Sequence, residues 1–227
     1  MRSAPVIKIC GLSTLPVLEA ALDARADMVG FVFFPKSPRH IDLATARALG
    51  QAVRGRAQKV ALSVDADDAL LAGIIGALAP DLLQLHGHET PERVAAVKNK
   101  FGLPVMKVLP VATAADLAAV AAYDKIADRL LFDAKPPPGA RHPGGNGLSF
   151  DWRLIENLDP AVPAMLSGGL DPANVASAIA LTGMAGVDVS SGVESAPGVK
   201  DVAKIAAFIK NARAAYAALA VPARSRV

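Results

Sequence analysis

Eight short apolar runs, spaced along the whole chain and separated by helix-like segments, constrain the fold most. These runs are rich in β-branched residues and occupy 6–10, 28–34, 59–64, 82–86, 105–109, 130–133, 164–167 and 186–190. Helical patterns begin near Thr14, Asp42, Ala66, Thr90, Thr113, Asp151, Asp171 and Lys200. Strands that alternate with helices pair in parallel, because each helix carries the chain back to the edge where the strand began. Eight such units in 227 residues predict an α/β fold, a single (β/α)8 TIM barrel.

The composition agrees with one domain of this kind. The chain is 52% hydrophobic but only 4% aromatic, which suits a core of Ala, Val, Leu and Ile around strands buried on both faces. No low-complexity linker interrupts the pattern. We therefore expect a single barrel domain over residues 1–219 and a frayed tail over 220–227.

Charge and cysteine content narrow the classes of partner. The net charge of +3 is mild, and the basic residues form no dense cluster with aromatic residues between them, so we expect no nucleic-acid partner. A slightly basic balance suits an anionic small molecule. Cys10 is the one cysteine, so no disulfide can form within the chain. With no signal-like segment and no apolar run of membrane length, we expect a cytoplasmic protein without a membrane partner, either a monomer or a homodimer.

Within the strands, polar side chains recur on one face. Lys8 and Cys10 lie opposite Ile7 and Ile9, because successive side chains of a strand point to opposite faces. The same alternation places further polar residues on one face: Gln84, His86, Asp133, Asp188 and Ser190. In an open sheet both faces would meet helices, whereas a barrel turns one face toward a shared interior. The alternation therefore favours the barrel.

The polar residues also gather where their strands end. Cys10, His86, Asp133 and Ser190 each close a predicted strand at its carboxyl end. Barrel enzymes carry their chemistry at that end, whereas the opposite end contributes stability. The sequence therefore predicts an active site built from these strand ends.

Two loops of small residues follow the last two strands. They contain Ser167, Gly168 and Gly169 in the first loop, and Ser190, Ser191 and Gly192 in the second. Backbone N–H groups without side-chain bulk can approach an anion closely, and barrels commonly hold a phosphate at this place. Tight turns alone would explain either loop. The matching pair favours a phosphate site.

The longest connection, from residue 134 to 149, is rich in Pro and Gly. A connection of this length in a compact domain is usually functional or disordered. It leaves directly from Asp133, so a lid over the site and a segment without a function are both open interpretations.

Several motifs resemble the phosphoribosylanthranilate isomerase family, in the family's order and over about residues 6–212. They are Lys8-Ile9-Cys10-Gly11, the segment 30–39, Gln84-Leu85-His86-Gly87, the segments 150–152 and 166–170, and the segment 188–194. The resemblance implies a barrel isomerase of tryptophan biosynthesis. Its reaction is a cofactor-free Amadori rearrangement of N-(5'-phosphoribosyl)anthranilate to 1-(2-carboxyphenylamino)-1-deoxyribulose 5-phosphate, and it uses no metal.

The resemblance also implies roles for three residues. It makes Cys10 the general base, and we expect Lys8 on the same strand face to lower the pKa of the thiol. It makes Asp133 the general acid, which must be protonated although an ordinary Asp carboxyl is mostly ionised at pH 7. Ala134 stands where the family usually has Thr or Ser, so one hydroxyl that would orient Asp133 is missing. Arg39 matches the arginine that binds the anthranilate carboxylate through a two-pronged guanidinium.

The remaining polar residues of the interior face are expected near the substrate. Gln84 and His86 line the predicted anthranilate pocket, with a purely structural role for His86 left open. Lys8 and Asp188 are also assigned to substrate binding, Asp188 through a supporting hydrogen bond.

Three other functions fit the sequence less well. The related isomerase of histidine biosynthesis has an aspartate in place of Cys10 and two phosphate sites in two similar halves, and the chain has no such half-repeat. A pentose-phosphate epimerase needs metal ligands at several strand ends, where the four histidines do not fall. A phosphate-binding sensor without activity would need neither Cys10 nor Asp133.

Overall fold

The computed structural model describes residues 4–137, 139–140 and 142–220, and the barrel prediction is confirmed. Eight parallel strands pair in sequence order and close β1 against β8. They are β1 (Val6–Cys10), β2 (Met28–Phe33), β3 (Gln58–Ser63), β4 (Leu82–Leu85), β5 (Val105–Val111), β6 (Arg129–Ala134), β7 (Ala164–Leu166) and β8 (Gly186–Val189). The predicted tail, 220–227, lies outside the described residues apart from Ala220.

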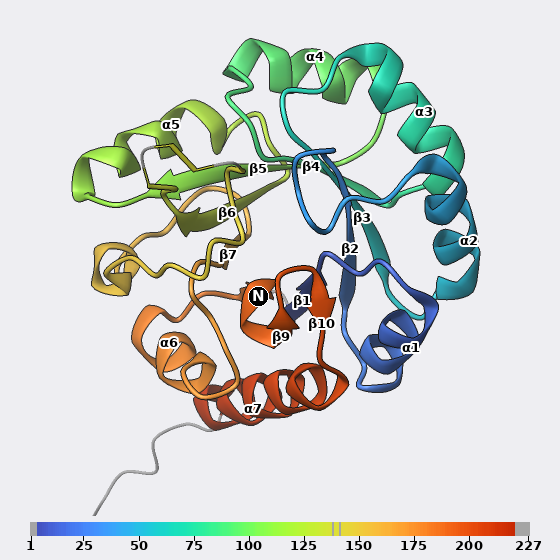
Figure 1. Ribbon diagram of the computed structural model, residues 1–227. Helices are drawn as coiled ribbons and strands as arrows, with labels where there is room; N and C mark the ends of the chain where they lie inside the picture. Colours follow the sequence, from blue (N-terminus) through green and yellow to red (C-terminus); the bar gives the residue numbers. More distant parts are fainter. Residues whose placement is uncertain (1–3, 138, 141, 221–227) are drawn as a thin grey trace, which may run out of the picture.

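An outer ring of helices surrounds the strands (Figure 1). The α-helices are α1 (Leu15–Asp23), α2 (Leu43–Val53), α3 (Asp68–Leu78), α4 (Pro91–Phe101), α5 (Val120–Tyr123), α6 (Val175–Thr182) and α7 (Val202–Ala220). Several begin at side chains that accept a free backbone N–H of the first turn. The Asp42 carboxylate accepts from Thr45 at 2.7 Å, and Asp67 accepts from Leu70 at 2.8 Å.

Two predicted helices differ from the structure. The segment predicted to be helical from Asp151 forms only the 3-10 turn η2 (Trp152–Ile155), and Pro160 and Pro163 limit how far any helix could continue. The segment after Thr113 begins as the 3-10 helix η1 (Ala114–Ala119) and ends in the single turn of α5.

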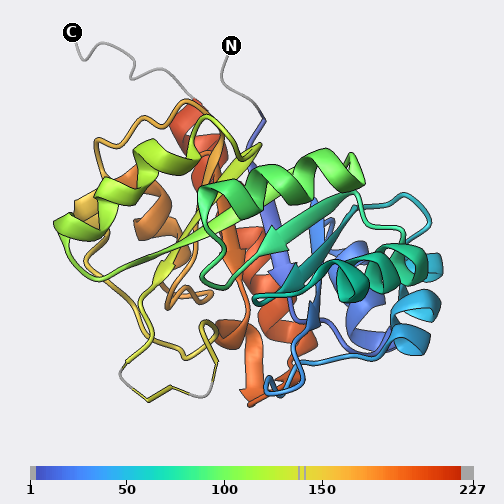
Figure 2. The same cartoon turned by 90° about the horizontal axis from the view of Figure 1, so that it is seen from above.

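A small hairpin between β8 and the last helix was not predicted. It consists of β9 (Glu194–Ala196) and β10 (Val199–Lys200), paired antiparallel, and it moves the start of the last helix from Lys200 to Val202. Figure 2 shows that this hairpin and the connection that follows β6 lie at the same end of the barrel. It is the end where the parallel strands finish.

The core has an outer layer and an interior one, as the strand alternation predicts. Ile7, Ile9, Leu130 and Phe132 pack outward against the helices in the large outer cluster. The base of the barrel interior is apolar and contains Met28, Val60, Leu82, Met106, Val108, Leu131 and Met165. Above it the interior becomes polar, so the polar strand ends meet over an apolar floor. Within the described part of the chain, no helix has the length and apolar character needed to cross a membrane.

Candidate active site

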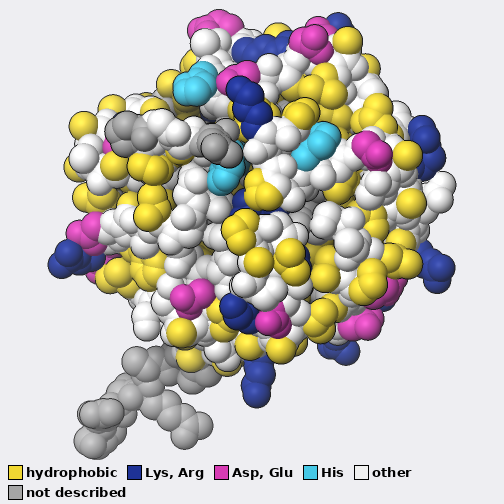
Figure 3. Space-filling model, in the orientation of Figure 1, with side chains coloured by type: hydrophobic (Ala, Val, Ile, Leu, Met, Phe, Trp, Pro, Cys, Tyr) yellow, Lys and Arg dark blue, Asp and Glu magenta, His cyan; other side chains and the backbone are white. Residues whose placement is uncertain are grey.

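A cavity opens at the carboxyl ends of the strands and brings most of the predicted site residues together. Its walls include Cys10, Arg39, Gln84, His86, Asp133 and Asp188, together with the segments 167–170, 189–191 and 142–148. Figure 3 shows this face of the molecule, on which histidine side chains are exposed and acidic and basic side chains are scattered from the centre to the edge. The cavity is small, about 60 Å³, which is room for a few water molecules.

Lys8 lies beneath the cavity and does not line it. Its side chain is fully buried, and its Nζ donates to Asp188 Oδ1 at 2.9 Å. The pairing follows from the sheet register, which places Lys8 directly beside Asp188 on the neighbouring strand. Burial works to lower the pKa of Lys8, but Asp188 and the neighbouring Cys10 thiol outweigh it, so its pKa is raised. Lys8 therefore affects the cavity only through Asp188 and Cys10, which do line it.

The Cys10 thiol faces the cavity floor, and its ionisation differs from our expectation. Burial raises the pKa of this thiol, and the negative charge of Asp188 adds to the effect. Lys8 opposes the rise but does not overcome it. Lys8 does lower the pKa of the thiol, as expected, but burial outweighs this effect, so the expected net lowering of the pKa is wrong for the free protein.

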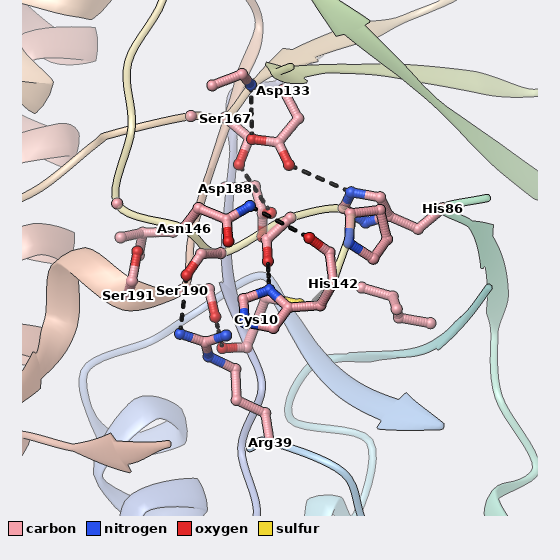
Figure 4. A pocket seen from close by; sticks show the side chains of 18 of the residues that line it. Cys10, Arg39, His86, Asp133, His142, Asn146, Ser167, Asp188, Ser190 and Ser191 are labelled. Atoms are coloured by element: carbon pink, nitrogen blue, oxygen red, sulfur yellow. Dashed lines mark hydrogen bonds and ion pairs between the residues drawn. The ribbon is translucent and has the colours of Figure 1, made fainter. Parts of the chain in front are cut away.

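Asp133 and His86 point toward one another across the cavity (Figure 4). His86 Nε2 lies 3.2 Å from Asp133 Oδ2, and His86 Nδ1 lies 3.2 Å from Gln84 Nε2. The other carboxylate oxygen of Asp133 accepts the backbone N–H of Ala134 at 2.9 Å. Ala134 has no side-chain hydroxyl to bond this carboxylate, but its backbone N–H orients the carboxylate instead.

Arg39 reaches into the cavity from the opposite side to Asp133 (Figure 4). Its Nε and Nη2 donate to Glu194 Oε1 and Oε2 at 2.7 and 2.8 Å. Glu194 also accepts from Lys200 Nζ at 2.7 Å. Sequence reasoning assigned no role to Glu194 or Lys200. The only sequence signal was the place of Glu194 at the end of a family-like segment.

The two loops of small residues line the cavity unequally. Gly168 and Gly169 have φ of +83° and +68°, a backbone region that favours glycine, and both line the cavity with Ser190 and Ser191. Gly192 does not line it. An added Cβ at Gly192 would collide with the Leu170 carbonyl, so this glycine lets one loop pack against the other.

Glycines of the long connection close over these groups. A Cβ on Gly144 would lie 2.6 Å from the His86 ring and 2.8 Å from Asp133 Oδ2. Gly145 accepts a bond from Arg39 Nη2 at 3.2 Å through its carbonyl. The described part of this connection therefore covers the acidic and the basic side of the cavity together.

No metal centre is apparent in the described ranges, where no group of three or more His, Cys, Asp or Glu side chains is placed to hold an ion. The chemistry available in the cavity is that of a thiol, a carboxyl paired with an imidazole, a guanidinium and unhindered backbone amides.

Comparison with known proteins decides the family. The family model of N-(5'phosphoribosyl)anthranilate (PRA) isomerase matches residues 7–211. The chain belongs to this family. The N-(5'-phosphoribosyl)anthranilate isomerase of Nitrobacter hamburgensis is 63% identical over 210 residues, covering 92% of this chain and 93% of that protein. The one from Rhodopseudomonas palustris strain BisB18 is 64% identical over 209 residues, covering 92% and 96%.

Solved PRA isomerases share the fold. The crystal structure of the Thermotoga maritima PRA isomerase superposes with a TM-score of 0.83 at 34% identity, over 92% of this chain and 99% of that chain. A PRA isomerase in complex with reduced 1-(o-carboxyphenylamino)-1-deoxyribulose 5-phosphate gives a TM-score of 0.81 at 32% identity, with the same coverage. Monomers derived from the dimeric T. maritima enzyme give 0.80 at 33% identity.

Proposed function

We propose that this PRA isomerase family member converts N-(5'-phosphoribosyl)anthranilate to 1-(2-carboxyphenylamino)-1-deoxyribulose 5-phosphate in tryptophan biosynthesis. The observation that carries the proposal is the placement of the Cys10 thiol and the Asp133 carboxyl on one cavity, with an arginine and two small-residue loops around them. An acid and a base on one cavity are what an aldose–ketose isomerisation needs. A cytoplasmic location and a monomeric or homodimeric state stay predictions.

The reaction requires two proton movements, which we assign to two residues. Protonated Asp133 donates its proton to the furanose ring oxygen, the C1–O bond breaks, and the anthranilate nitrogen forms an iminium with C1. Cys10 thiolate then removes the proton from C2, and the electron pair forms the C1=C2 bond of an enolamine. The enolamine gains a proton at C1 and loses the C2 hydroxyl proton, so the product is an isomer and no oxidant is needed.

The substrate itself helps to generate the base. Since burial raises the pKa of Cys10, the thiol form dominates in the free protein at neutral pH. A nearby positive charge favours the thiolate, and the iminium formed after ring opening supplies such a charge beside C2. His86, which faces Asp133 at 3.2 Å, is positioned to share the proton that Asp133 donates.

Recognition of the substrate is assigned to groups around the two catalytic residues. Arg39 binds the anthranilate carboxylate, and Gln84 and His86 form the adjoining wall. Backbone N–H groups around Gly168, Gly169 and Ser191 hold the phosphate. Asp188 supports this arrangement through Lys8 and through Ser167, whose hydroxyl donates to it at 3.3 Å.

The long connection acts as a lid in this proposal. A cavity of about 60 Å³ is far too small for a phosphorylated sugar joined to an aromatic ring. The segment 142–148 forms one wall of the cavity, so substrate entry requires that it withdraw. Its return over the bound substrate would exclude water from the reacting atoms.

The test is turnover of enzymatically generated N-(5'-phosphoribosyl)anthranilate, followed through the decay of its fluorescence. Cys10→Ala and Asp133→Asn are expected to fold normally and to lose at least ~10²-fold in kcat, the low end for a general acid or base. Asp151→Asn, at an exposed carboxylate paired with Arg153, is the matched control for a lost charge. Absence of turnover by the unmodified protein would refute the function, and near-normal turnover by either variant would refute that residue's role.

A further inference from the structure

Arg39 is held in a buried cluster with Glu194 and Lys200. Glu194 accepts two bonds from the guanidinium, at 2.7 and 2.8 Å, and one from Lys200 Nζ, at 2.7 Å. Lys200 Nζ also donates to the Ser190 carbonyl at 2.8 Å. All three charged side chains are buried. The mechanism above uses Arg39 but gives the other two charges no role.

Glu194 determines which end of the guanidinium remains available. It occupies Nε and one donor of Nη2, which form one edge of the planar group. The opposite end, formed by Nη1 and Nη2, faces Gly145: Nη2 donates to its carbonyl at 3.2 Å, and Nη1 lies 2.6 Å from where a Cβ would stand. This end, which Glu194 leaves free and which bonds only to the Gly145 carbonyl among the described residues, points into the cavity from the side opposite Asp133 (Figure 4).

The hairpin between β8 and α7 brings the cluster together. Glu194 begins β9, Lys200 ends β10, and the antiparallel register pairs these two residues. The turn between them includes Gly198 at φ +80°, whose N–H donates to Glu194 Oε2 at 3.2 Å. The hairpin thus places a carboxylate and its cation against a residue of the β2 loop.

The charges of the cluster do not cancel. When Arg39 and Lys200 are both protonated and Glu194 is ionised, the buried cluster carries one excess positive charge beside the cavity. Burial opposes ionisation of Glu194, but the bonds from Arg39 and the charge of Lys200 outweigh it and lower its pKa. Burial also lowers the pKa of Lys200, while Glu194 favours its charged form. A ligand carboxylate at the free end of Arg39 would balance the cluster.

We propose that Glu194 and Lys200 are positioning residues that make Arg39 selective for a carboxylate on the ligand. Glu194 fixes the guanidinium so that its free end presents two parallel donors, and Lys200 holds Glu194 in place. This inference rests on the proposed function, since the ligand carboxylate is that of the anthranilate ring.

The experiment compares two ligands by calorimetry. One is reduced 1-(2-carboxyphenylamino)-1-deoxyribulose 5-phosphate, and the other is the same compound with hydrogen in place of the carboxylate. The variants are Glu194→Gln and Lys200→Met. The matched control is Glu89→Gln, because Glu89 forms an equally buried ion pair with Lys107 at 2.7 Å and neither residue contacts Arg39.

Glu194→Gln separates positioning from charge alone. If only the net charge mattered, replacing a carboxylate by an amide would tighten the binding of an anion. Positioning predicts the opposite: binding of the carboxylate ligand weakens roughly tenfold or more, as expected for a lost charged hydrogen bond, while the ligand without the carboxylate binds as before. Lys200→Met is expected to change the same ratio in the same direction. Glu89→Gln is expected to lower the Tm without changing the ratio of the two affinities.

Two outcomes would overturn the inference: tighter binding of the carboxylate ligand to Glu194→Gln, or equal weakening for both ligands. Turnover by the unmodified protein is measured in parallel, and its absence would refute the proposed function instead. A crystal structure of ligand-free Glu194→Gln provides an independent readout, in which the guanidinium of Arg39 is expected to leave its present orientation. An unchanged guanidinium would refute the positioning role whatever the substrate is.

Discussion

Lys8 offers a prediction in which stability and reactivity can be separated. Its ammonium is fully buried between the Asp188 carboxylate and the Cys10 thiol. Lys8→Met keeps most of the side-chain volume and removes the charge. Asp188 then remains buried, with the Ser167 hydroxyl at 3.3 Å as its remaining side-chain partner. Asp188→Asn is the matched variant, because it leaves the Lys8 ammonium without its counter-charge.

Both variants are expected to be less stable. Breaking a buried ion pair by removing one partner costs about 3–5 kcal/mol, because the other charge remains uncompensated. For a domain of this size each kcal/mol lowers the Tm by about 2–4 °C, so we expect a decrease of roughly 6–20 °C for either variant. The double variant removes both charges and is expected to lose less than the sum of the two single losses.

The reactivity of Cys10 is expected to change in opposite directions. Burial causes the largest change in the pKa of the thiol and raises it. The charge of Lys8 opposes this rise, and the charge of Asp188 adds to it. Since the thiolate is the reactive form, Lys8→Met should slow alkylation by iodoacetamide and move its pH profile to higher pH. Asp188→Asn should speed alkylation and move the profile to lower pH. Cys10 is the one cysteine in the chain, so the measured reaction reports on it alone.

The refuting result is a change of the same sign in both variants. Loss of stability opens the fold and would speed alkylation in both proteins, whereas the electrostatic account demands opposite signs. Faster alkylation of Lys8→Met under conditions where the protein is folded would show that Lys8 does not favour the thiolate.

Two further predictions test substrate recognition. Arg39→Lys keeps the charge but not the two-pronged geometry, and we expect product binding to weaken by about 1.5–3 kcal/mol with inorganic phosphate binding unchanged in calorimetry; equal weakening of both would contradict the assignment to the carboxylate. Gly169→Val places a Cβ 2.7 Å from that of Ser149 at φ +68°, and should raise the KM of the phosphorylated substrate by a large factor. Gly102→Val, at φ +64° with open space around it, controls for the backbone strain, and an equal rise in KM would disprove a phosphate role.

The barrel itself could be predicted because its signal repeats and is local. In β1, Lys8 and Cys10 alternate with Ile7 and Ile9, and the structure places the first two toward the interior and the others in the outer core. The same period of two placed Asp133 at the cavity. A strand is recognised from its own residues, so no knowledge of distant contacts was needed.

The secondary-structure elements that were predicted wrongly or not at all are short, so their own residues show no clear hydrophobic periodicity. Apolar residues after Asp151 resemble the start of a helix, but the segment before Pro160 is short and forms only a 3-10 turn. The strands of the β9–β10 hairpin have three and two residues, too few for an alternation to be seen. Glu194 and Lys200 pair across this hairpin and bond to one another through their side chains at 2.7 Å.

Interactions between distant residues explain what was missed in the site. Arg39 and Glu194 are 155 positions apart, so nothing in the neighbourhood of either residue indicates that they meet. The raised pKa of the Cys10 thiol has a related cause. Burial by the whole barrel raises it, and Asp188, 180 positions from Lys8, adds to the rise, whereas only the nearby charge of Lys8 can be seen in the local sequence.

Two glycines of the connection after β6 contact the residues that we assign to catalysis and to substrate binding. Gly144 packs against His86 and Asp133, and Gly145, at φ +71°, packs against the free end of Arg39; a side chain at either position would hold the backbone away from these groups. The connection therefore touches the same acid and the same guanidinium that we assign to the substrate. In the proposed function, a substrate carboxylate on Arg39 would take the place of the Gly145 carbonyl, which accepts from Nη2 at 3.2 Å. A charged carboxylate forms stronger hydrogen bonds with a guanidinium than a neutral backbone carbonyl does, so we expect binding to break this contact and release this part of the connection.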